Sequence, residues 1–343
     1  MDIITLGIES SCDETACAVV LNGTKTLSSV ISSQALFHSA FGGVVPELAS
    51  RMHVETIVPC VREALAQSGK KLSDIDAICV TKGPGLVGAL LVGISFAKGL
   101  AEVSHKPLIG VGHIDAHVAA NYLVHKDFKP PFIALIVSGG HTEIVYSANE
   151  TKQTIIGQTR DDAAGEAIDK IARVLGLGYP GGPRMDAAAK GGNPDAFEFP
   201  RTFFPDSCDF SFSGLKTAAL NIINKSHMAD EEINVADFSA SYLKTIAEIL
   251  SENCMKSCRQ LGCDRLCMAG GVSANSVLRD TMRRYSETNG IQLFYPPIEL
   301  CTDNAAMVAA AGYLSYLKGV RDDLSLNAEP SLRRERLGMV EDA

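Results

Sequence analysis

Apolar runs with strand-like and helix-like spacing alternate along the 343 residues of the chain. The runs "IITLGIE" and "TACAVVLNG" predict two strands joined by the turn "SSCDE", and "AICVTKGPG" predicts a strand ending in a glycine-proline turn. A helix is predicted from Val87 to Ala101, followed by a strand, a tight turn and a second strand from Phe132 to Asn149. Such alternation is typical of α/β layers.

The second half of the chain continues this alternation. Apolar residues at helical spacing predict helices from Ala163 to Leu177 and from about Val235 to Leu261, with "GYPGGPRMD" as a loop between them. "RLCMAGGVSANS" predicts a strand, a Gly-Gly turn and a helix start, and a last helix follows "IQLFYPPIELC". The candidate N-caps are Ser273 or Asn275 for the first of these helices and Thr302 or Asp303 for the second.

Two predicted hairpins about 130 residues apart resemble each other. "LGIESSCDETACAVV" and "ALIVSGGHTEIVYS" share an apolar strand, a small polar turn with Ser, a Thr at the exit and a second apolar strand. This internal similarity predicts two halves of similar topology.

Composition and charge narrow the class of protein. Hydrophobic residues make up 46% and charged residues 21%, which is typical of a globular chain of about two domains. The net charge of −9 provides no basic footprint, so a nucleic-acid partner would need local basic patches or another subunit. The ten cysteines lack the spacing of a zinc site and indicate buried thiols. No signal peptide is visible, and the longest apolar stretch, Gly85 to Ala101, is short and interrupted, which predicts a cytoplasmic protein.

Three turns at strand ends are candidates for phosphate binding: "ESSCDET", "VSGGHTE" and "AGGVSANS". Turns of small residues expose backbone N–H groups that phosphate oxygens can approach. None of the three matches G-x-G-x-x-G or the P-loop pattern. Asp13 and Glu14 in the first turn are able to hold a metal, orient a water or take a proton, and they also fit a solvated surface.

Two histidines four residues apart, His113 and His117, lie on one face of a predicted helix. A metal site needs a third ligand, for which His53, His141 and Asp303 are candidates. Two histidines with one carboxylate form an open ligand set for Zn²⁺ or Fe²⁺. The pair is not H-E-x-x-H, so the glutamate base of zinc peptidases is missing.

Taken together and in order, nine blocks of the sequence resemble the signature blocks of the bacterial TsaD family, the tRNA N6-adenosine threonylcarbamoyltransferases. They are "GIESSCDETACAVV", "SRMHVE", "TKGPGLVGALLVGISFAKGLA", "GHIDAHVAA", "VSGGHTE", "GEAIDKIARVLGLGYPGGPRMD", "FSFSGLKTA", "AGGVSANS" and "TDNAAM". The resemblance covers roughly Ile3 to Leu317.

The resemblance implies a two-lobed α/β fold of the actin-like ATPase class (sugar kinase, Hsp70 and actin). Its lobes are duplicated and RNase H-like, with a nucleotide and metal cleft between them. We expect the N-terminal lobe in residues 1–118, completed by a C-terminal helix in 303–325, the second lobe in residues 119–302, and a loose tail in residues 326–343.

The resemblance also implies a reaction and a set of site residues. Threonylcarbamoyl is moved from threonylcarbamoyl-AMP to N6 of adenosine 37 in tRNAs that read codons beginning with A. The metal ligands implied are His113, His117 and Asp303, for one divalent ion per chain, with Fe²⁺ preferred and Zn²⁺ as the alternative. The nucleotide-binding residues implied are Ile136, Val137, Ser138, Gly139, Gly140, Asp169, Gly182, Asp186 and Asn275. Asp13 is expected to receive the N6 proton, with Glu14 supporting it.

The partners implied are a TsaB-like paralogue and a TsaE-like ATPase, with a TsaC-type synthase upstream and no membrane. The sequence leaves two other functions open: a metal-dependent peptidase, and a nucleotide-binding actin-like ATPase without tRNA chemistry. A sugar kinase would leave the two histidines and the aspartate without a role.

Overall fold

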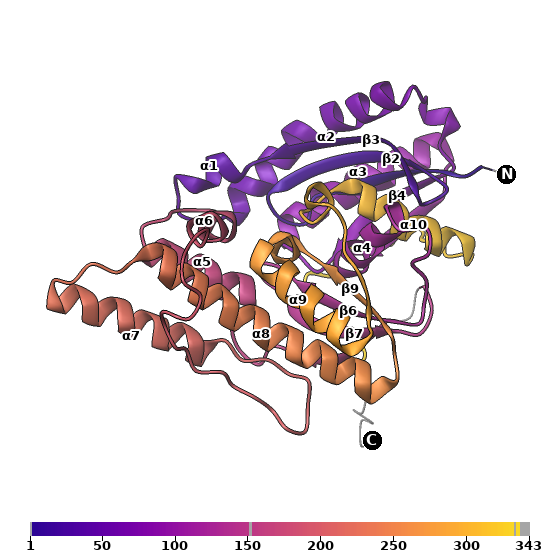
Figure 1. Ribbon diagram of the computed structural model, residues 1–343. Coiled ribbons are helices and arrows are strands. Elements are labelled where there is room, and N and C mark those ends of the chain that lie inside the picture. The colour runs from indigo at the N-terminus through magenta and orange to yellow at the C-terminus, as the bar shows by residue number, and fades with distance from the viewer. Residues whose placement is uncertain (1, 151–152, 333, 337–343) are drawn as a thin grey trace, which may run out of the picture. The chain divides into compact units, whose positions relative to one another are not determined.

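Two five-stranded sheets organise the chain, one in each of two units. The computed structural model describes residues 2–150, 153–332 and 334–336 (Figure 1). The first unit comprises residues 1–128 and 296–333, and the second comprises residues 129–295 and 334–343. The predicted α/β class is confirmed.

The sheet of the first unit begins with an antiparallel meander and continues with parallel strands. Its order is β3-β2-β1-β4-β5, with β1–β2 and β2–β3 antiparallel and β1–β4 and β4–β5 parallel. The strands are β1 (Ile4–Glu9), β2 (Glu14–Leu21), β3 (Lys25–Ser33), β4 (Ala77–Gly83) and β5 (Leu108–Gly112).

Helices cover both faces of this sheet. They are α1 (Ala35–Ser39), α2 (Pro46–Ser68), α3 (Val87–Ser104), α4 (His113–Ala119) and α10 (Ala305–Leu317). Since side chains alternate along a strand, Cys17 and Val19 pack in one core with α2 and α3, while Ala16 and Ala18 pack against α10 on the opposite face. Figure 1 shows α2 running alongside β3 and β2. α10 lies so close to β1 that a Cβ at Gly7 would be 2.1 Å from the Ala305 carbonyl oxygen.

The second unit repeats the topology of the first. Its strands are β6 (Phe132–Val137), β7 (Thr142–Ser147), β8 (Gln153–Gln158), β9 (Arg265–Ala269) and β10 (Gln292–Phe294). The order β8-β7-β6-β9-β10 corresponds strand for strand to β3-β2-β1-β4-β5, with the same parallel and antiparallel pairings. The two similar hairpins of the sequence are β1–β2 and β6–β7, so the predicted duplication is confirmed.

Most of the core of the second unit lies between one face of its sheet and the helices α5, α7 and α8. Leu135, Ile144 and Met268 of the sheet are buried with Ile168 of α5 and Phe238 of α8. The helices of this unit are α5 (Ala164–Val174), α6 (Gly181–Ala188), α7 (Ser213–Ala229), α8 (Val235–Leu261) and α9 (Ser276–Asn289). α6 begins inside the segment predicted as a loop. That prediction was wrong because the carboxylate of Asp169 accepts the first N–H groups of α6, which compensates for the poor helix propensity of its glycines.

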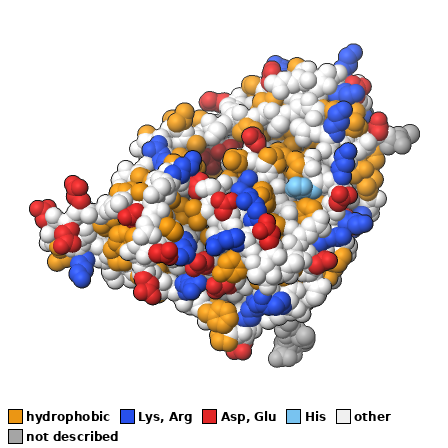
Figure 2. All heavy atoms as spheres, viewed as in Figure 1, with side chains coloured by type: hydrophobic (Ala, Val, Ile, Leu, Met, Phe, Trp, Pro, Cys, Tyr) orange, Lys and Arg blue, Asp and Glu red, His pale blue; other side chains and the backbone are white. Residues whose placement is uncertain are grey.

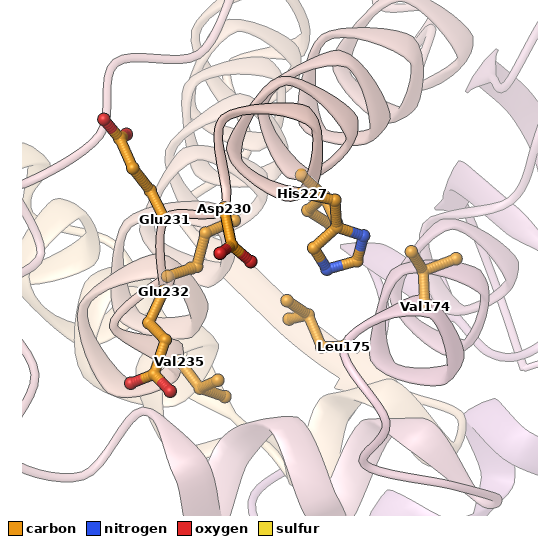
Figure 3. A pocket seen from close by; sticks show the side chains of 9 residues that line it. Val174, Leu175, His227, Asp230, Glu231, Glu232 and Val235 are labelled. Carbon is orange, nitrogen blue, oxygen red and sulfur yellow. The ribbon is translucent and has the colours of Figure 1, made fainter.

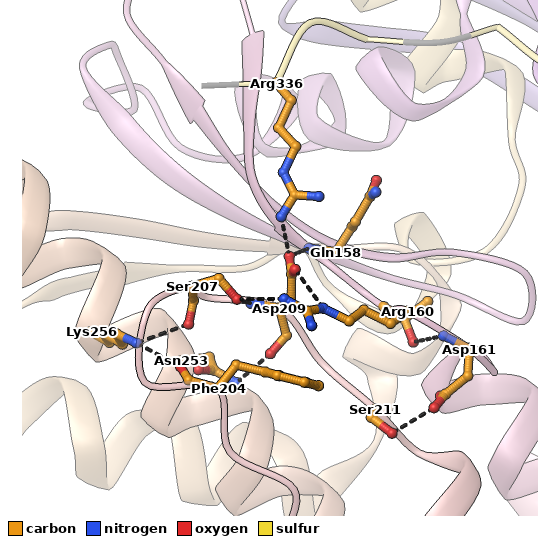
Figure 4. Close-up of polar contacts among 11 residues, drawn as sticks. Gln158, Arg160, Asp161, Phe204, Ser207, Asp209, Ser211, Asn253, Lys256 and Arg336 are labelled. Carbon is orange, nitrogen blue, oxygen red and sulfur yellow. Dashed lines mark hydrogen bonds and ion pairs between the residues drawn. The ribbon is translucent and has the colours of Figure 1, made fainter. Parts of the chain in front are cut away.

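A buried carboxylate fastens the segment before α7 to the end of β8 (Figure 4). Asp209 is 2% exposed and accepts hydrogen bonds from the Gln158 backbone N–H at 3.1 Å, Arg160 Nε at 2.9 Å and Arg336 Nη2 at 2.6 Å. Burial raises the pKa of Asp209, but these donors outweigh burial and hold the pKa below its usual range.

The first residues of the predicted loose tail are packed in the structure. Leu326 is buried in the core of the first unit, and Glu329 pairs with Lys82 through its backbone N–H (2.7 Å) and its carboxylate (2.8 Å). Residues 333 and 337–343 of the predicted tail lie outside the described residues. The expected lobe boundaries, after residues 118 and 302, differ from those of the structure, after residues 128 and 295. The helical turn Ala120–Leu123 packs against α10, which draws this segment into the first unit.

One described helix, α3, is long and apolar enough by length and composition to cross a bilayer. Leu90, Ile94 and Ala97 on one face of α3 belong to the core of the first unit. A core helix of a globular unit meets the same two criteria.

Candidate functional site

The two histidines of the sequence lie on one face of α4 in the first unit, directly after β5. His113 is 8% exposed and His117 is 2% exposed, and their ring centroids lie 4.6 Å apart. Asp303 Oδ1 lies 3.5 Å from Nε2 of His113 and 3.1 Å from Nε2 of His117. Among the described residues, these three form the group of possible metal ligands, with all ligand atoms within 4.8 Å of one another.

Asp303 faces the histidines because its neighbour caps the last helix. Asn304 Oδ1 accepts the backbone N–H of Met307 at 3.0 Å, so neither Thr302 nor Asp303 is the N-cap of α10. The predicted cap was therefore wrong by one or two residues, and this shift leaves the carboxylate of Asp303 directed at the two rings.

Glu9 completes this cluster and is a residue that the sequence analysis missed. It ends β1, is fully buried, and places Oε2 at 3.2 Å from His113 Nδ1 and 2.6 Å from the hydroxyl of Thr81. Burial raises the pKa of Glu9, but the attraction and hydrogen bond of His113 outweigh burial and lower it. The available signal in the sequence was a single acid at the end of the apolar run "ITLGIE".

The electrostatics of the cluster fit a divalent metal ion. Because Glu9 accepts at Nδ1 of His113, we assign the proton to Nδ1, and the lone pair of Nε2 then points toward the Asp303 carboxylate. Neither ring nitrogen of buried His117 makes a hydrogen bond to any described residue. When both rings are neutral and unprotonated at Nε2, as metal binding requires, three electron-pair donors converge, and a cation between them would relieve the repulsion.

The spacing of the donors supports the same conclusion. Metal bonds near 2.1 Å place neighbouring ligand atoms about 3.0–3.4 Å apart in octahedral or tetrahedral geometry. The separations of 3.5 Å and 3.1 Å between Asp303 Oδ1 and the two Nε2 atoms lie close to this range.

The other candidate ligands have different surroundings. His53 is buried with Nε2 at 2.9 Å from the Cys12 carbonyl oxygen and Nδ1 at 2.7 Å from the hydroxyl of Thr15. Burial lowers the pKa of His53, as expected for a neutral ring that braces the β1–β2 turn. His141 lies in the second unit, in the β6–β7 turn. All ten cysteines are free thiols, nine of them buried, in agreement with the sequence prediction.

The acidic pair lies at the same end of the sheet as the histidines. Asp13 is 9% exposed, and its carbonyl oxygen accepts the backbone N–H of Gln34 at 2.9 Å. Burial, the charge of Asp303 and the charge of Asp13, in that order, raise the pKa of Glu14 to about 9. In the metal-free chain, Glu14 is then protonated near neutral pH, unlike an ordinary surface carboxylate.

The predicted nucleotide-binding residues are brought together in the second unit by four close contacts. A Cβ on Gly270 would be 2.5 Å from the Val137 carbonyl oxygen, and a Cβ on Gly165 would be 2.4 Å from that of Ser138. The "SGG" turn of residues 138–140 therefore lies against the end of β9 and the start of α5.

The remaining two contacts involve the starts of α6 and α9. Asp169 Oδ1 accepts the N–H groups of Gly181 at 2.8 Å and Gly182 at 3.0 Å, and burial raises its pKa. Asp186 accepts from both the N–H and the hydroxyl of Ser276, directly beside Asn275. Asn275 caps α9 through Leu278 N–H at 2.9 Å, which selects it over Ser273.

A cavity of about 630 Å³ in the second unit lies among other residues (Figure 3). It is lined by Val174, Leu175, Ile223, His227, Asp230, Glu231, Glu232, Ile233 and Val235. This lining contains none of the predicted site residues, so the cavity is separate from the candidate site. On the molecular face of Figure 2, basic and acidic side chains are interspersed, in line with the absence of a basic footprint in the composition.

Comparison with known proteins supports one family. The model of the TsaD family, described as tRNA N6-adenosine threonylcarbamoyltransferase, matches residues 25–310. Curated proteins with that name from Clostridium perfringens and Clostridium beijerinckii are 56% and 55% identical to the chain over 331 residues, covering 96% of this chain and 98% of each relative.

Solved structures identify the fold. HypF of T. kodakarensis superimposes with a TM-score of 0.62 at 16% identity, covering 93% of this chain and 48% of HypF. Component A of the Acidaminococcus fermentans (R)-2-hydroxyglutaryl-CoA dehydratase has a TM-score of 0.53 at 14% identity, covering 92% of this chain and 99% of that one. At such identities the likeness shows the fold alone, and this fold is that of the actin-like ATPases.

Proposed function

The chain belongs to the TsaD family of tRNA N6-adenosine threonylcarbamoyltransferases, and from this premise we propose that it makes threonylcarbamoyladenosine in tRNA. It transfers threonylcarbamoyl from threonylcarbamoyl-AMP to N6 of adenosine 37 in tRNAs that read codons beginning with A, and it releases AMP. The observation that carries this proposal is 56% identity over 96% of the chain to a relative with that name.

The reaction is an acyl transfer to a weak nucleophile. The N6 nitrogen attacks the carbamoyl carbon, the bond from this carbon to the phosphate oxygen breaks, and AMP leaves with the electron pair. One N6 proton must move to a base. Since the lone pair of N6 is delocalised into the adenine ring, holding the two reactants in line is the main task of the protein, worth up to about 7–11 kcal/mol.

His113, His117 and Asp303 would hold the metal ion, with Fe²⁺ preferred and Zn²⁺ as the alternative. When bound, the ion would supply Lewis-acid chemistry toward the carbamoyl carbonyl and would help to position the threonyl part. Glu9 fixes the tautomer and orientation of His113 through Nδ1, which directs Nε2 into the cluster.

Asp13 is the group that we propose to receive the N6 proton. Glu14, whose pKa is raised by burial and by the charges of Asp303 and Asp13, would support Asp13 rather than act as a second base. Replacement of Asp13 by Asn should lower the single-turnover transfer rate by about 10²–10⁴-fold with donor affinity retained. An unchanged rate with intact donor binding would exclude Asp13 as the base.

The second unit would bind the AMP part of the donor. The N–H groups of Gly139 and Gly140, in the turn that follows Ile136 and Val137 of β6, would face the phosphate, as expected for an anion site without Cβ atoms. Asp169 engages its Oδ1 with Gly181 and Gly182, which leaves Oδ2 for a ribose hydroxyl. Asp186 and Asn275 hold the turn before α9 beside the nucleotide.

Charge supports dependence on other proteins. At a net charge of −9, the chain has little attraction for the tRNA backbone, so a TsaB-like paralogue and a TsaE-like ATPase assist it in the cytoplasm, with a TsaC-type synthase supplying the donor. The test is incubation of the chain with threonylcarbamoyl-AMP, unmodified tRNA and the partner proteins, followed by nucleoside analysis. Formation of the modified nucleoside is expected. Its absence with a metal-loaded, folded chain would refute the proposal.

A further inference from the structure

An exposed aromatic tip follows β3 in the first unit. Leu36, Phe37 and Phe41 are 91%, 44% and 57% exposed, although they are large apolar residues. The rings of Phe37 and Phe41 lie with centroids 5.6 Å apart and planes at 50°. We call the segment of residues 35–43 the aromatic tip.

Buried polar contacts fasten the aromatic tip to the acidic turn. His38, between the two phenylalanines, is fully buried, with Nε2 at 3.1 Å from Gln34 Oε1 and Nδ1 at 3.3 Å from the Val45 backbone N. Gln34 is 2% exposed and donates its backbone N–H to the Asp13 carbonyl oxygen at 2.9 Å. Hydrogen bonds therefore connect the segment that carries the two rings to Asp13, the residue proposed as the base.

We propose that Phe37 and Phe41 stack on bases of the tRNA anticodon loop next to the target adenosine, an inference that rests on the proposed function. For its N6 to reach Asp13, the adenosine must leave its stack, and its neighbours then lose a stacking partner. Aromatic side chains provide such a partner for any base, because every base has a π-face. Helix α2 follows the aromatic tip in the chain. Arg51 in its second turn is exposed and is a cation suited to a phosphate.

The test compares removal of the rings with removal of apolar surface. Phe37→Ala and Phe41→Ala are measured beside Leu36→Ala, which removes the most exposed apolar side chain but no ring. The full chain with its partner proteins is titrated with tRNA and with a fluorescent anticodon stem-loop, and threonylcarbamoyl-AMP affinity and melting temperature are recorded in parallel.

Base stacking predicts a specific pattern. Each Phe→Ala change should raise the Kd and KM for tRNA by about tenfold, with donor affinity and melting temperature retained. Phe41→Tyr should bind tRNA as the wild type does. Phe41→Leu should bind as weakly as Phe41→Ala, because it keeps apolar surface but has no ring. Leu36→Ala should bind tRNA as the wild type does. The dependence of log Kd on log salt should be unchanged in the Phe variants and shallower by about one in Arg51→Ala.

Two results would overturn the inference. One is unchanged tRNA affinity in the Phe37→Ala, Phe41→Ala double variant. The other is an equal effect of Leu36→Ala together with weaker association of the partner proteins, which would assign the aromatic tip to protein docking. If the wild-type chain forms the modified nucleoside, either result refutes this inference alone. If it does not, the proposed function fails first.

Discussion

The β1–β2 turn of the first unit and the β6–β7 turn of the second occupy the same place in the same topology, yet they carry opposite chemistry. Around the first turn, Glu9, Asp13 and Glu14 supply carboxylates, and the histidines of α4 lie beside them. The second turn consists of Ser138, Gly139, Gly140 and His141, and its two glycines are exposed and have no Cβ. In the function proposed above, the first turn would therefore lie beside the ligands of a cation, and the second turn would present amides to an anion.

The largest expected effect comes from removing a ligand of the first turn's cluster. His117→Ala should abolish stoichiometric metal binding and lower transfer to tRNA by at least about 10³-fold, since a metal contributes several kcal/mol to such reactions. Metal content by mass spectrometry and nucleoside analysis are the measurements. The exposed His105, changed to Asn because it has a positive φ of 52°, is the control and should retain both. Full activity in a folded, metal-free His117→Ala variant would refute the metal's role.

A smaller effect is expected from a change of Glu9, which contacts the ligand His113. Glu9→Gln should weaken metal affinity by about 10–100-fold, because an amide orients His113 less strongly than a carboxylate. Chelator competition measures this affinity, with exposed Glu102→Gln as the matched control. Equal affinities in the wild type and the Glu9→Gln variant would show that Glu9 serves packing alone.

In the second unit, Gly165→Ala should displace the "SGG" turn, which we propose to bind the phosphate. The added Cβ would lie 2.4 Å from the Ser138 carbonyl oxygen and 2.8 Å from Gly139 Cα. We expect a loss of about 1–3 kcal/mol in the free energy of unfolding and about tenfold weaker AMP binding, with metal content unchanged.

Gly99→Ala is the matched control for this change. A Cβ at Gly99 in α3 would meet no atom within 4 Å, and the variant should be more stable by about 0.5–1 kcal/mol. Calorimetric titration with AMP and thermal unfolding compare the two variants. Loss of metal from Gly165→Ala would contradict the separation of roles between the turns.

The smallest effect on tRNA modification is expected from the pH dependence of stability. The pKa of Glu14 rises from 4.5 to about 9 on folding, so the folded chain binds more protons than the unfolded chain between these values. Stability from this group is complete below pH 4.5 and declines as the pH rises toward 9, by at most about 1.4 kcal/mol per pH unit. In the metal-free chain, Glu14→Gln should therefore raise the melting temperature at pH 8 more than at pH 5.

The control for this pH effect is Glu47→Gln, an exposed residue at the start of α2. It should leave the pH dependence of the melting temperature as in the wild type. An identical pH dependence of Glu14→Gln and the wild type would show that Glu14 is ionised in the folded chain.

Local pattern was enough to predict much of the architecture. The alternation of apolar runs predicted the α/β class, the similarity of two hairpins predicted the duplicated topology, and the limits of α8 agree with the predicted Val235 to Leu261. These features depend on periodicity within short segments, which reports the buried face of each strand or helix. The residue types of a possible metal site, His113 and His117, were also visible locally because four residues make one helical turn.

The sequence by itself thus determined the elements, their duplication and the types of ligand. Only the tertiary structure decided which distant side chains meet: Asp303 rather than His53 at the histidines, Glu9 behind His113, and Asp169 at the start of a helix where a loop was predicted. Strand order and register place Glu9 beside β4 and α4, and Asn304 turns Asp303 toward them by taking the cap. Such contacts join residues up to 190 positions apart (Asp303 and His113), and no periodicity within a segment encodes them.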